Sequence, residues 1–394
     1  MTIFRSVWPL VAATFASGTQ AYVFAGLLGD MARDLSVSIG TVGQLATAYA
    51  ITFALAAPAA AGFAGRRERR GVLTMALVAV ALINVLAAIT PAFAGLIGLR
   101  IAAGFAATFI VPIASATAIS LTTPEVRGRA LAFVAGGTTV AFMLGIPAGS
   151  VIGGAFGWRA TFVFAATLSA LAAIIVRIAI PAVPPQPRPA GTVVQLLRRD
   201  DVAPALMSIF LGFAATFTVV AYVGPVVSTI TGATGGHVGL YQLCVGVGSL
   251  IGVPLGGWLV DRGHGRTIPV GVFAVMMVTL SSYTILLSGG LAEFAPALLA
   301  AIILAGAAAL FTLIPAMQAR LVATAPEAAP LLLGASGSVM FLGQGAGAMF
   351  GGVITDHLGF PAIGVAGASL ALGALLFSAA SALRRPAISI APAE

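Results

Sequence analysis

Long apolar segments and short polar loops alternate along the whole chain. Each apolar segment lasts about 20 residues, which is the length that an α-helix needs to cross a bilayer. Strands of a membrane barrel need only about 10 residues each, so the pattern predicts helices. The twelve predicted segments lie at approximately 7–28, 40–62, 72–91, 93–119, 130–154, 160–179, 204–229, 237–259, 268–288, 293–319, 331–354 and 360–383.

A proline-rich stretch, 181–191, separates the sixth segment from the seventh, and charged residues follow it at 198–201. Prolines and charges cannot lie together in hydrocarbon, so this stretch is expected to be a cytoplasmic linker. The predicted organisation is an N-terminal six-helix bundle, a linker, a C-terminal six-helix bundle and a cytoplasmic tail, at 1–180, 181–203, 204–385 and 386–394.

The two halves of the chain resemble each other. The repeated pieces are Thr122–Glu125 with Thr324–Glu327 and Gly149–Ala160 with Gly351–Ala362, both 202 residues apart, and Tyr22 with Tyr222 at a spacing of 200. One register held over several segments indicates a six-plus-six repeat. We therefore expect an all-α polytopic membrane protein, with twelve transmembrane helices in two pseudo-symmetric six-helix bundles. Carriers built from parallel repeats place their substrate site near the midplane, between the halves.

The composition agrees with a membrane protein, because only 8% of the residues are charged and 60% are hydrophobic. Soluble domains carry about 25% charged residues. Arginines cluster in alternate loops, at 66–70, 127–129, 198–199 and 262–266, whereas the other loops hold only Arg33 and Arg159. This positive-inside pattern places both termini in the cytoplasm. It also explains the basic pI of 10.9 without any nucleic-acid partner.

Arg100 is a charge deep inside an apolar segment, roughly 10 Å from its start at 1.5 Å per residue. Such a charge costs at least ~2.5 kcal/mol on insertion scales, and it normally has a partner. Three partners are open: backbone carbonyls or polar side chains such as Gln20 and Asn84, a negative group on a substrate, or Asp30. A purely structural arginine bound to carbonyls at a helix break is also possible. The repeat places Ile302 at the equivalent position, so the charge is not a symmetric scaffold feature.

Three local motifs resemble the major facilitator superfamily. The loop with Asp261, Arg262 and Arg266 is similar to the cytoplasmic Gly-x-x-x-Asp-Arg-x-Gly-Arg motif, with one extra residue. In that family the aspartate pairs with an arginine and locks one conformation. The N-terminal copy has Gly65 in place of the aspartate, so that loop is expected either to lack the lock or to serve only as a basic anchor.

The other two motifs lie in segments four and five. Arg100 and Gly104 match the family's Arg-x-x-x-Gly element. Gly145, Pro147 and Gly149 resemble its Gly-x-Pro-x-Gly antiporter motif. Proline removes a backbone hydrogen bond and the glycines allow close packing, so a bent helix with a smooth face is expected there.

Together the motifs resemble the drug:proton antiporter-1 group of efflux permeases, which includes sugar, arabinose and chloramphenicol exporters. The resemblance implies a monomeric, multi-pass protein of the bacterial plasma (inner) membrane. It implies secondary active efflux of a small neutral or lipophilic compound by alternating access, in exchange for protons and without a cofactor or metal. An intramembrane enzyme or receptor is not expected, because the sequence has no His-Glu-x-x-His, paired intramembrane aspartates or Walker loop.

Many members of that group carry a proton-binding acid in the first helix, where this chain has Gln20. Glutamine does not titrate, so the proton site is not carried over. Asp30 is the remaining carboxylate considered beside the cavity, and His237 could also titrate. The coupling or recognition candidates are Arg100, Asp30 and Gln20. The missing acid keeps an alternative open, an exporter or facilitator of a sugar or nucleoside with weak or no proton coupling.

By the same resemblance, the substrate cavity lies between the two halves. The expected lining residues are Tyr22, Tyr49, Phe109, Tyr222, Gln242, Gln318 and Gln344. Further phenylalanines, among them Phe53, Phe217 and Phe341, are available for an apolar wall. A cavity so poor in charge suits a neutral, moderately lipophilic solute.

Overall fold

The computed structural model describes residues 2–64, 67–184, 196, 199 and 201–383, and the described chain contains helices and no strands. Twelve helical segments are long and apolar enough to cross a membrane, as the sequence pattern predicts. Eight of these transmembrane segments are single helices: α3 (Ile39–Ala64), α4 (Arg69–Ile89), α9 (Trp158–Ala179), α13 (Gly236–Asp261), α14 (Ile268–Leu287), α15 (Ala295–Thr324), α16 (Ala329–Leu358) and α17 (Ala362–Leu383).

The other four segments are interrupted, which the apolar pattern does not reveal. They are α1 (Thr2–Tyr22) with α2 (Leu28–Asp34), α5 (Phe93–Ala107) with α6 (Ile110–Ser120), α7 (Arg127–Val140) with α8 (Ile146–Phe156), and α11 (Val202–Val220) with α12 (Val223–Thr231). The first segment therefore reaches Asp34, several residues beyond the predicted end.

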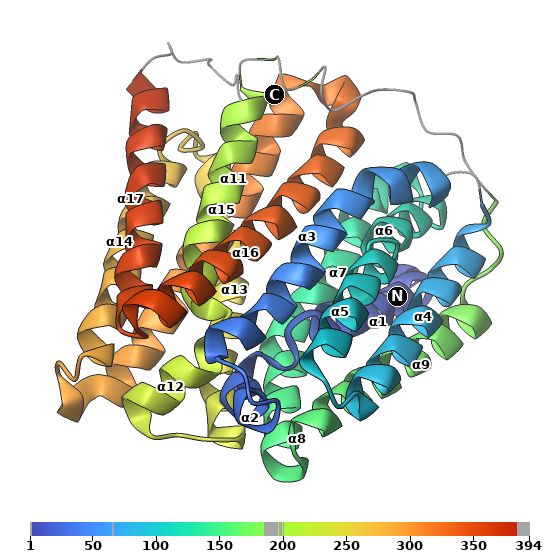
Figure 1. Ribbon diagram of the computed structural model, residues 1–394. Coiled ribbons are helices and arrows are strands. Elements are labelled where there is room, and N and C mark those ends of the chain that lie inside the picture. The colour runs from blue at the N-terminus through green and yellow to red at the C-terminus, as the bar shows by residue number, and fades with distance from the viewer. Residues whose placement is uncertain (1, 65–66, 185–195, 197–198, 200, 384–394) are drawn as a thin grey trace.

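The helices form two six-helix bundles with the repeat expected from the sequence (Figure 1). Gly157 and Gly359, 202 residues apart, have φ of +85° and +86° and each precedes a helix. Short 3₁₀ turns at Pro124–Val126 and Pro326–Ala328 also match at this spacing. Positive φ is easily adopted only by glycine, so the same backbone conformation requires a glycine at this position in both halves. Most of the predicted linker, and the predicted tail, lie outside the described residues.

Glycines let α1 pack closely against α7 and α8. A Cβ added at Gly137 would collide with Thr14 and the backbone of α1, and one at Gly145 would lie 2.9 Å from the Thr19 Cβ. Between α7 and α8 the helix takes a π-helical turn, Ala141–Gly145, just before Pro147. Proline cannot donate its backbone hydrogen bond, and π-turns are one way in which helices absorb that loss. The antiporter-like motif thus forms a bent, smooth surface against α1.

The two bundles meet along α3 with α16 and along α8 with α13 (Figure 1). Polar contacts join them near the end that carries α2 and α12, which we call the closed end. Ser38 Oγ donates to Asp356 at 2.9 Å, and Ser150 Oγ donates to Gln242 Oε1 at 2.7 Å. Gly154 and Gly235 allow backbone contact there as well. The structure therefore shows the halves packed together at this end.

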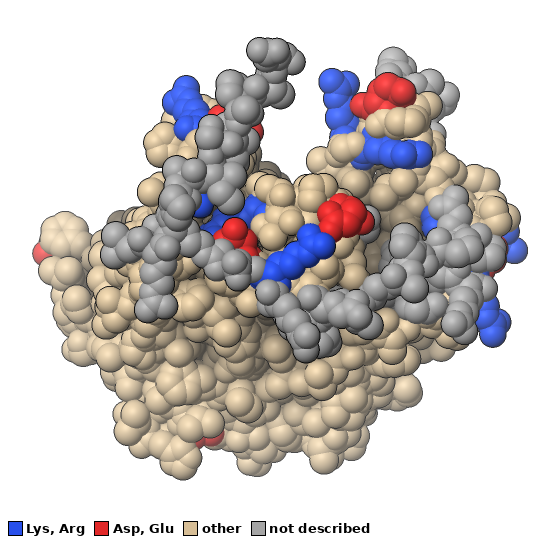
Figure 2. Space-filling view, turned by 90° about the horizontal axis from the view of Figure 1, so that it is seen from above, with Lys and Arg blue, Asp and Glu red and all other residues tan. Residues whose placement is uncertain are grey.

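The opposite end, where α9 ends and α11 begins, is called the linker end. Figure 2 looks onto it and shows acidic and basic side chains gathered in clusters. Arg199 and Glu327 form an ion pair there, with 2.7 Å between Nη2 of the arginine and Oε1 of the glutamate. Hydrogen bonds from its own backbone N–H and from Arg199 hold the pKa of Glu327 below its ordinary value. Asp261 is exposed and makes no ion pair with any described residue, so its role as a lock stays a prediction.

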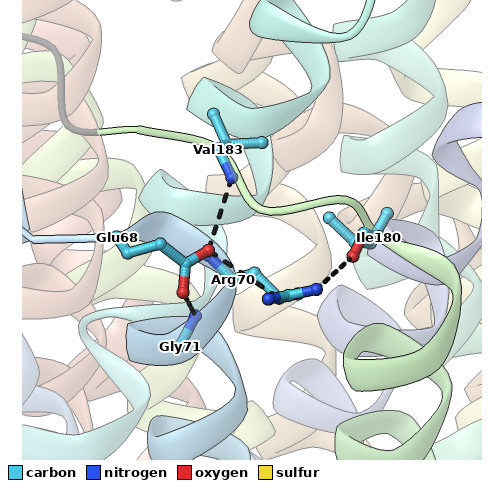
Figure 3. Close-up of polar contacts among 5 residues, drawn as sticks. All are labelled: Glu68, Arg70, Gly71, Ile180 and Val183. Carbon is cyan, nitrogen blue, oxygen red and sulfur yellow. Dashed lines mark hydrogen bonds and ion pairs between the residues drawn. The ribbon is translucent and has the colours of Figure 1, made fainter.

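Residues of the loop before α4 and of the first turn of α4 form hydrogen bonds with each other and with the chain that follows α9 (Figure 3). Glu68 caps α4 by accepting from the backbone N–H of Arg70 at 3.0 Å and of Gly71 at 2.9 Å. The Val183 N–H donates to the same carboxylate, and Arg70 donates to the Ile180 carbonyl. This arrangement ties the chain that follows α9 to the start of α4. The loop therefore has a structural role in addition to its basic residues, and anchoring by its arginines stays a prediction.

Two neighbouring glycines of α7 test the packing. Gly137→Val would force a side chain into α1, and overpacking of this kind costs about 1–3 kcal/mol. A Cβ added at Gly136 would meet no atom within 4 Å, so Gly136→Val is the matched control. We expect a lower thermal unfolding midpoint for Gly137→Val than for the control, measured on detergent-purified protein. Equal midpoints would show that α1 and α7 do not need this close contact.

Candidate functional site

A break in α1 lies at the centre of the site. The helix ends at Tyr22, and a short 3₁₀ turn, Ala25–Leu27, precedes α2. The last carbonyls of a helix have no partner within it. Arg100, on α5, supplies the missing donors: Nη1 donates to the Gln20 carbonyl at 3.1 Å and Nη2 donates to the Ala21 carbonyl. The side chain thus holds the broken end of α1 from the neighbouring helix.

The charge of Arg100 is balanced by carbonyl dipoles and aromatic rings. The side chain is only 1% exposed. Its guanidinium carbon lies 4.9 Å from the centre of the Phe24 ring and 4.6 Å from that of Tyr49. A desolvated cation against ring faces gains about 2 kcal/mol or more. Of the three partners considered from the sequence, the structure shows the carbonyls.

The other suggested partners of Arg100 lie elsewhere. Asp30 pairs with Arg33 at the protein surface, and nearly half of its side chain is exposed. The possible contact between Asp30 and Arg100 is therefore not formed, because α2 carries Asp30 beyond the break and toward the closed end. Asn84 donates to the Val80 carbonyl of its own helix at 2.8 Å.

Hydrogen bonds continue from this break across both halves. Gln20 Nε2 donates to the Tyr49 hydroxyl at 3.0 Å. The Tyr22 hydroxyl donates to Gln344 Oε1 on α16, so the N-terminal bundle contacts the C-terminal one here. Gln20, Tyr49 and Gln344 are all nearly or fully buried. Gln20, a candidate for coupling or recognition, thus lies close to Tyr49 and Gln344, which were expected to line the substrate cavity.

Aromatic rings from both halves surround these hydrogen bonds. Phe53 and Phe341 stack with ring centres 3.9 Å apart, and Tyr22 lies 5.3 Å from Phe217. Tyr22 and Tyr49 meet edge to face at 6.3 Å. We call the following residues the central cluster: Gln20, Tyr22, Tyr49, Phe53, Phe217, Phe341 and Gln344. It joins α1, α3, α11 and α16 and contains no carboxylate among its members.

Other predicted cavity residues lie outside this cluster. Tyr222 is fully buried and donates to the Ala348 carbonyl of α16 at 2.7 Å. Gln242 joins Ser150 at the contact between the halves. Phe109 packs on Phe63 and Phe105, with ring centres 6.0 and 5.6 Å away. Gln318 is half-buried on α15.

The sequence analysis missed the polar contacts that join the two halves. Ser150 directly follows the antiporter-like motif, yet a single serine in an apolar helix gives no signal of its partner. Asp356 faces the start of α3, where a Cβ at Gly40 would lie 2.5 Å from its carboxylate oxygen. Among the described residues, no group of His, Cys, Asp and Glu could hold a metal ion.

Comparisons with known proteins agree with this architecture. The sequence profile of the Major Facilitator Superfamily matches residues 10–290 and 205–393. The Escherichia coli K12 inner membrane transport protein YdhP is 32% identical over 96% of this chain and 97% of its own length. A chloramphenicol resistance protein of Streptomyces lividans is 31% identical over 66% of this chain and 68% of its own.

Solved structures share the fold at low identity. A bacterial homologue of the lysosomal transporter Spinster, in an inward-facing and unoccupied conformation, has a TM-score of 0.72 and 15% identity, covering 96% of this chain and 95% of that one. The nucleoside transporter NupG has a TM-score of 0.76 and 11% identity, covering 95% and 98%. The described residues form twelve helical segments long and apolar enough to span a membrane, and the family profile matches nearly the whole length, so this chain belongs to the major facilitator superfamily of membrane transporters.

Proposed function

We propose that this transporter exports a small neutral or lipophilic, drug-like compound by alternating access, in exchange for protons. The observation that carries the proposal is the central cluster. It joins the two halves at the break in α1 and offers aromatic rings with a few amide and hydroxyl groups. Ligand sites of this kind are mostly apolar, with few polar groups that fix orientation.

The state of Arg100 favours a neutral solute. Two of its nitrogens already donate to carbonyls, and two aromatic rings cover its faces. The Nε of Arg100 has no hydrogen-bond partner, but the side chain is only 1% exposed, so an anionic substrate would have to enter this buried site or displace these contacts. A cationic substrate would find no carboxylate in the cluster and would lie near a buried positive charge. Both alternatives are costly in a medium of low dielectric constant.

The resemblance to exporters supports the direction of transport. One relative is a chloramphenicol resistance protein, and the antiporter-like motif packs closely against α1. The arginine clusters favour a cytoplasmic position for the linker end and both termini. In this proposal the bundles at 1–180 and 204–385 rock about the central cluster as a monomer in a bacterial plasma membrane.

A sugar or nucleoside carrier with weak or no proton coupling is the second candidate. The central cluster has Gln20 where related antiporters have an acid, and amides and hydroxyls can bind a sugar or a base. A nucleoside transporter also shares the fold. This candidate needs no titrating group inside the membrane, whereas proton exchange requires one elsewhere in the chain.

Transport in proteoliposomes separates the two candidates. With an acidic lumen, proton exchange would drive a neutral solute such as chloramphenicol inward against its gradient. We expect uptake above that of vesicles without a pH gradient, abolished by a protonophore. Uridine or sugar flux that ignores the pH gradient would instead support the second candidate and contradict proton exchange.

Arg100→Ala should abolish transport with near-normal membrane insertion. The substitution removes the donors of two buried carbonyls, and each unpartnered group costs about 1–3 kcal/mol. The break in α1 should then lose its fixed geometry. Arg129→Ala, at an exposed position, is the control for loss of one positive charge. If Arg100→Ala transports at the wild-type rate, the residue has no part in transport.

Tyr22→Phe tests the hydrogen bond between the halves. Loss of the hydroxyl leaves Gln344 without this donor, which should favour separation of the halves at the closed end. We expect Ser38→Cys to react several-fold faster with an external maleimide in this background, since a net hydrogen bond is worth about 1 kcal/mol. Cys244 is replaced by serine in all variants, and Tyr283→Phe, within one bundle, is the matched control. An unchanged labelling rate would show that the bond does not hold the halves together.

A further inference from the structure

Two of the interrupted segments, one from each bundle, cross at a pair of glycines. Gly26 lies in the 3₁₀ turn that follows the break in α1, and Gly224 lies in the first turn of α12, which follows the break in α11. A Cβ added at Gly224 would lie 2.4 Å from the Gly26 carbonyl oxygen and 2.6 Å from its carbonyl carbon. The backbones of the two bundles therefore touch here, and we call this contact the glycine crossing.

Space, and not backbone conformation, requires glycine at both positions. Neither Gly26 nor Gly224 is among the described glycines with a positive φ. A Cβ added at Gly26 would lie 2.1 Å from Ser150 Oγ and 3.1 Å from Gln242 Nε2. Carbon atoms pack best at about 3.5–4.0 Å, so a methyl group on either glycine would be too close to its neighbours. Side chains can rotate away from such a methyl group, whereas the backbone that faces Gly224 cannot.

The glycine crossing lies between the central cluster and the closed end. Tyr22, a member of the cluster, ends α1, and Gly26 follows it along the chain toward α2. The short helices α2 and α12, which follow the two breaks, contact each other at the closed end (Figure 1). A solute in the central cluster can pass these breaks only when they separate. This step rests on the transport site proposed above.

An unsatisfied hydrogen-bond donor lies beside the crossing. Gln242 Oε1 accepts from Ser150 Oγ at 2.7 Å, but Gln242 Nε2 has no partner, and the residue is only 3% exposed. A buried donor without a partner raises the free energy of the state that buries it. Water that enters between the bundles would give this donor a partner. Separation of the bundles at this point therefore recovers part of the cost of the closed state.

We propose that the glycine crossing is the seal of the transport path at the closed end, and that it is poised to open. Backbone contact between Gly26 and Gly224 excludes water and solute while this end is closed. The unpartnered amide nitrogen of Gln242 opposes that contact. A small steric change is therefore enough to shift the protein toward the state that is open at this end, and one methyl group acts as a wedge.

Distances between spin labels in the purified full-length chain test the seal. Cys244 is replaced by serine, and one label pair is placed at each end, at the exposed positions Ala92→Cys with Ser288→Cys (closed end) and Arg129→Cys with His264→Cys (linker end). We expect Gly224→Ala to raise the ratio of open to closed molecules about tenfold, because overpacking destabilises the closed state. The closed-end distance then lengthens and the linker-end distance shortens. Gly26→Ala should shift both distances in the same directions by less, because its methyl group meets side chains.

Gly29→Ala is the matched control, because Gly29 lies in α2 and a Cβ there would meet no atom within 4 Å. Its two distances should equal those of the wild type. Thermal unfolding checks that each variant is folded, and Gly26→Ala decides alone if Gly224→Ala is not.

Unchanged distances in the folded variants would overturn the proposal, and so would an equal shift in Gly29→Ala. A longer closed-end distance with an unchanged linker-end distance would also overturn it, since that result shows local loosening. The measurement uses no transported solute, so a failure of export or of proton exchange leaves its result unaffected.

Discussion

The contact between the Arg100 guanidinium and the end of α1 organises the rest of the site. A helix that stops inside a bilayer leaves carbonyls without donors, and hydrocarbon offers none. Arg100 provides those donors, and the rings of Phe24 and Tyr49 cover its charge. The break in turn places Gln20 and Tyr22 where they reach Tyr49 and Gln344.

Close packing makes this break possible. Gly137 of α7 and Gly145 of the π-helical turn let α1 approach closely, so that Thr14 and Thr19 lie against these glycines. The π-helical turn before Pro147 keeps that surface continuous across the bend. Small residues are the usual means by which membrane helices pack, because lipid gives no hydrophobic drive between them. Glycines serve the contact between the halves as well, since Gly154 and Gly235 allow backbone contact there.

The apolar pattern predicted the twelve helices and the repeat because each span depends on its own composition. It could not predict the interruptions, since the residues around Tyr22 and Tyr222 are as apolar as their neighbours. Arg100 stood out in the sequence because a charge inside the membrane has a high free-energy cost. The backbone carbonyls that it binds carry no sequence signal. Tyr22, Tyr49 and Gln344 were expected in one cavity and do lie together. Tyr222 and Phe109 were expected there from their residue type and from the segments that carry them, but their positions depend on helix rotation, which the pattern leaves open.

Tyr22 and Tyr222 occupy matching positions in the repeat, yet their hydroxyls bind differently. Tyr222 donates to a carbonyl of its own bundle, whereas Tyr22 donates to a side chain of the other bundle. A separation of the bundles at the closed end would leave the hydrogen bond of Tyr222 intact and would break that of Tyr22. The two repeats are therefore unequal in this structure: the hydroxyl at the C-terminal break is bonded within its own bundle, while the hydroxyl at the N-terminal break belongs to the contact between the bundles.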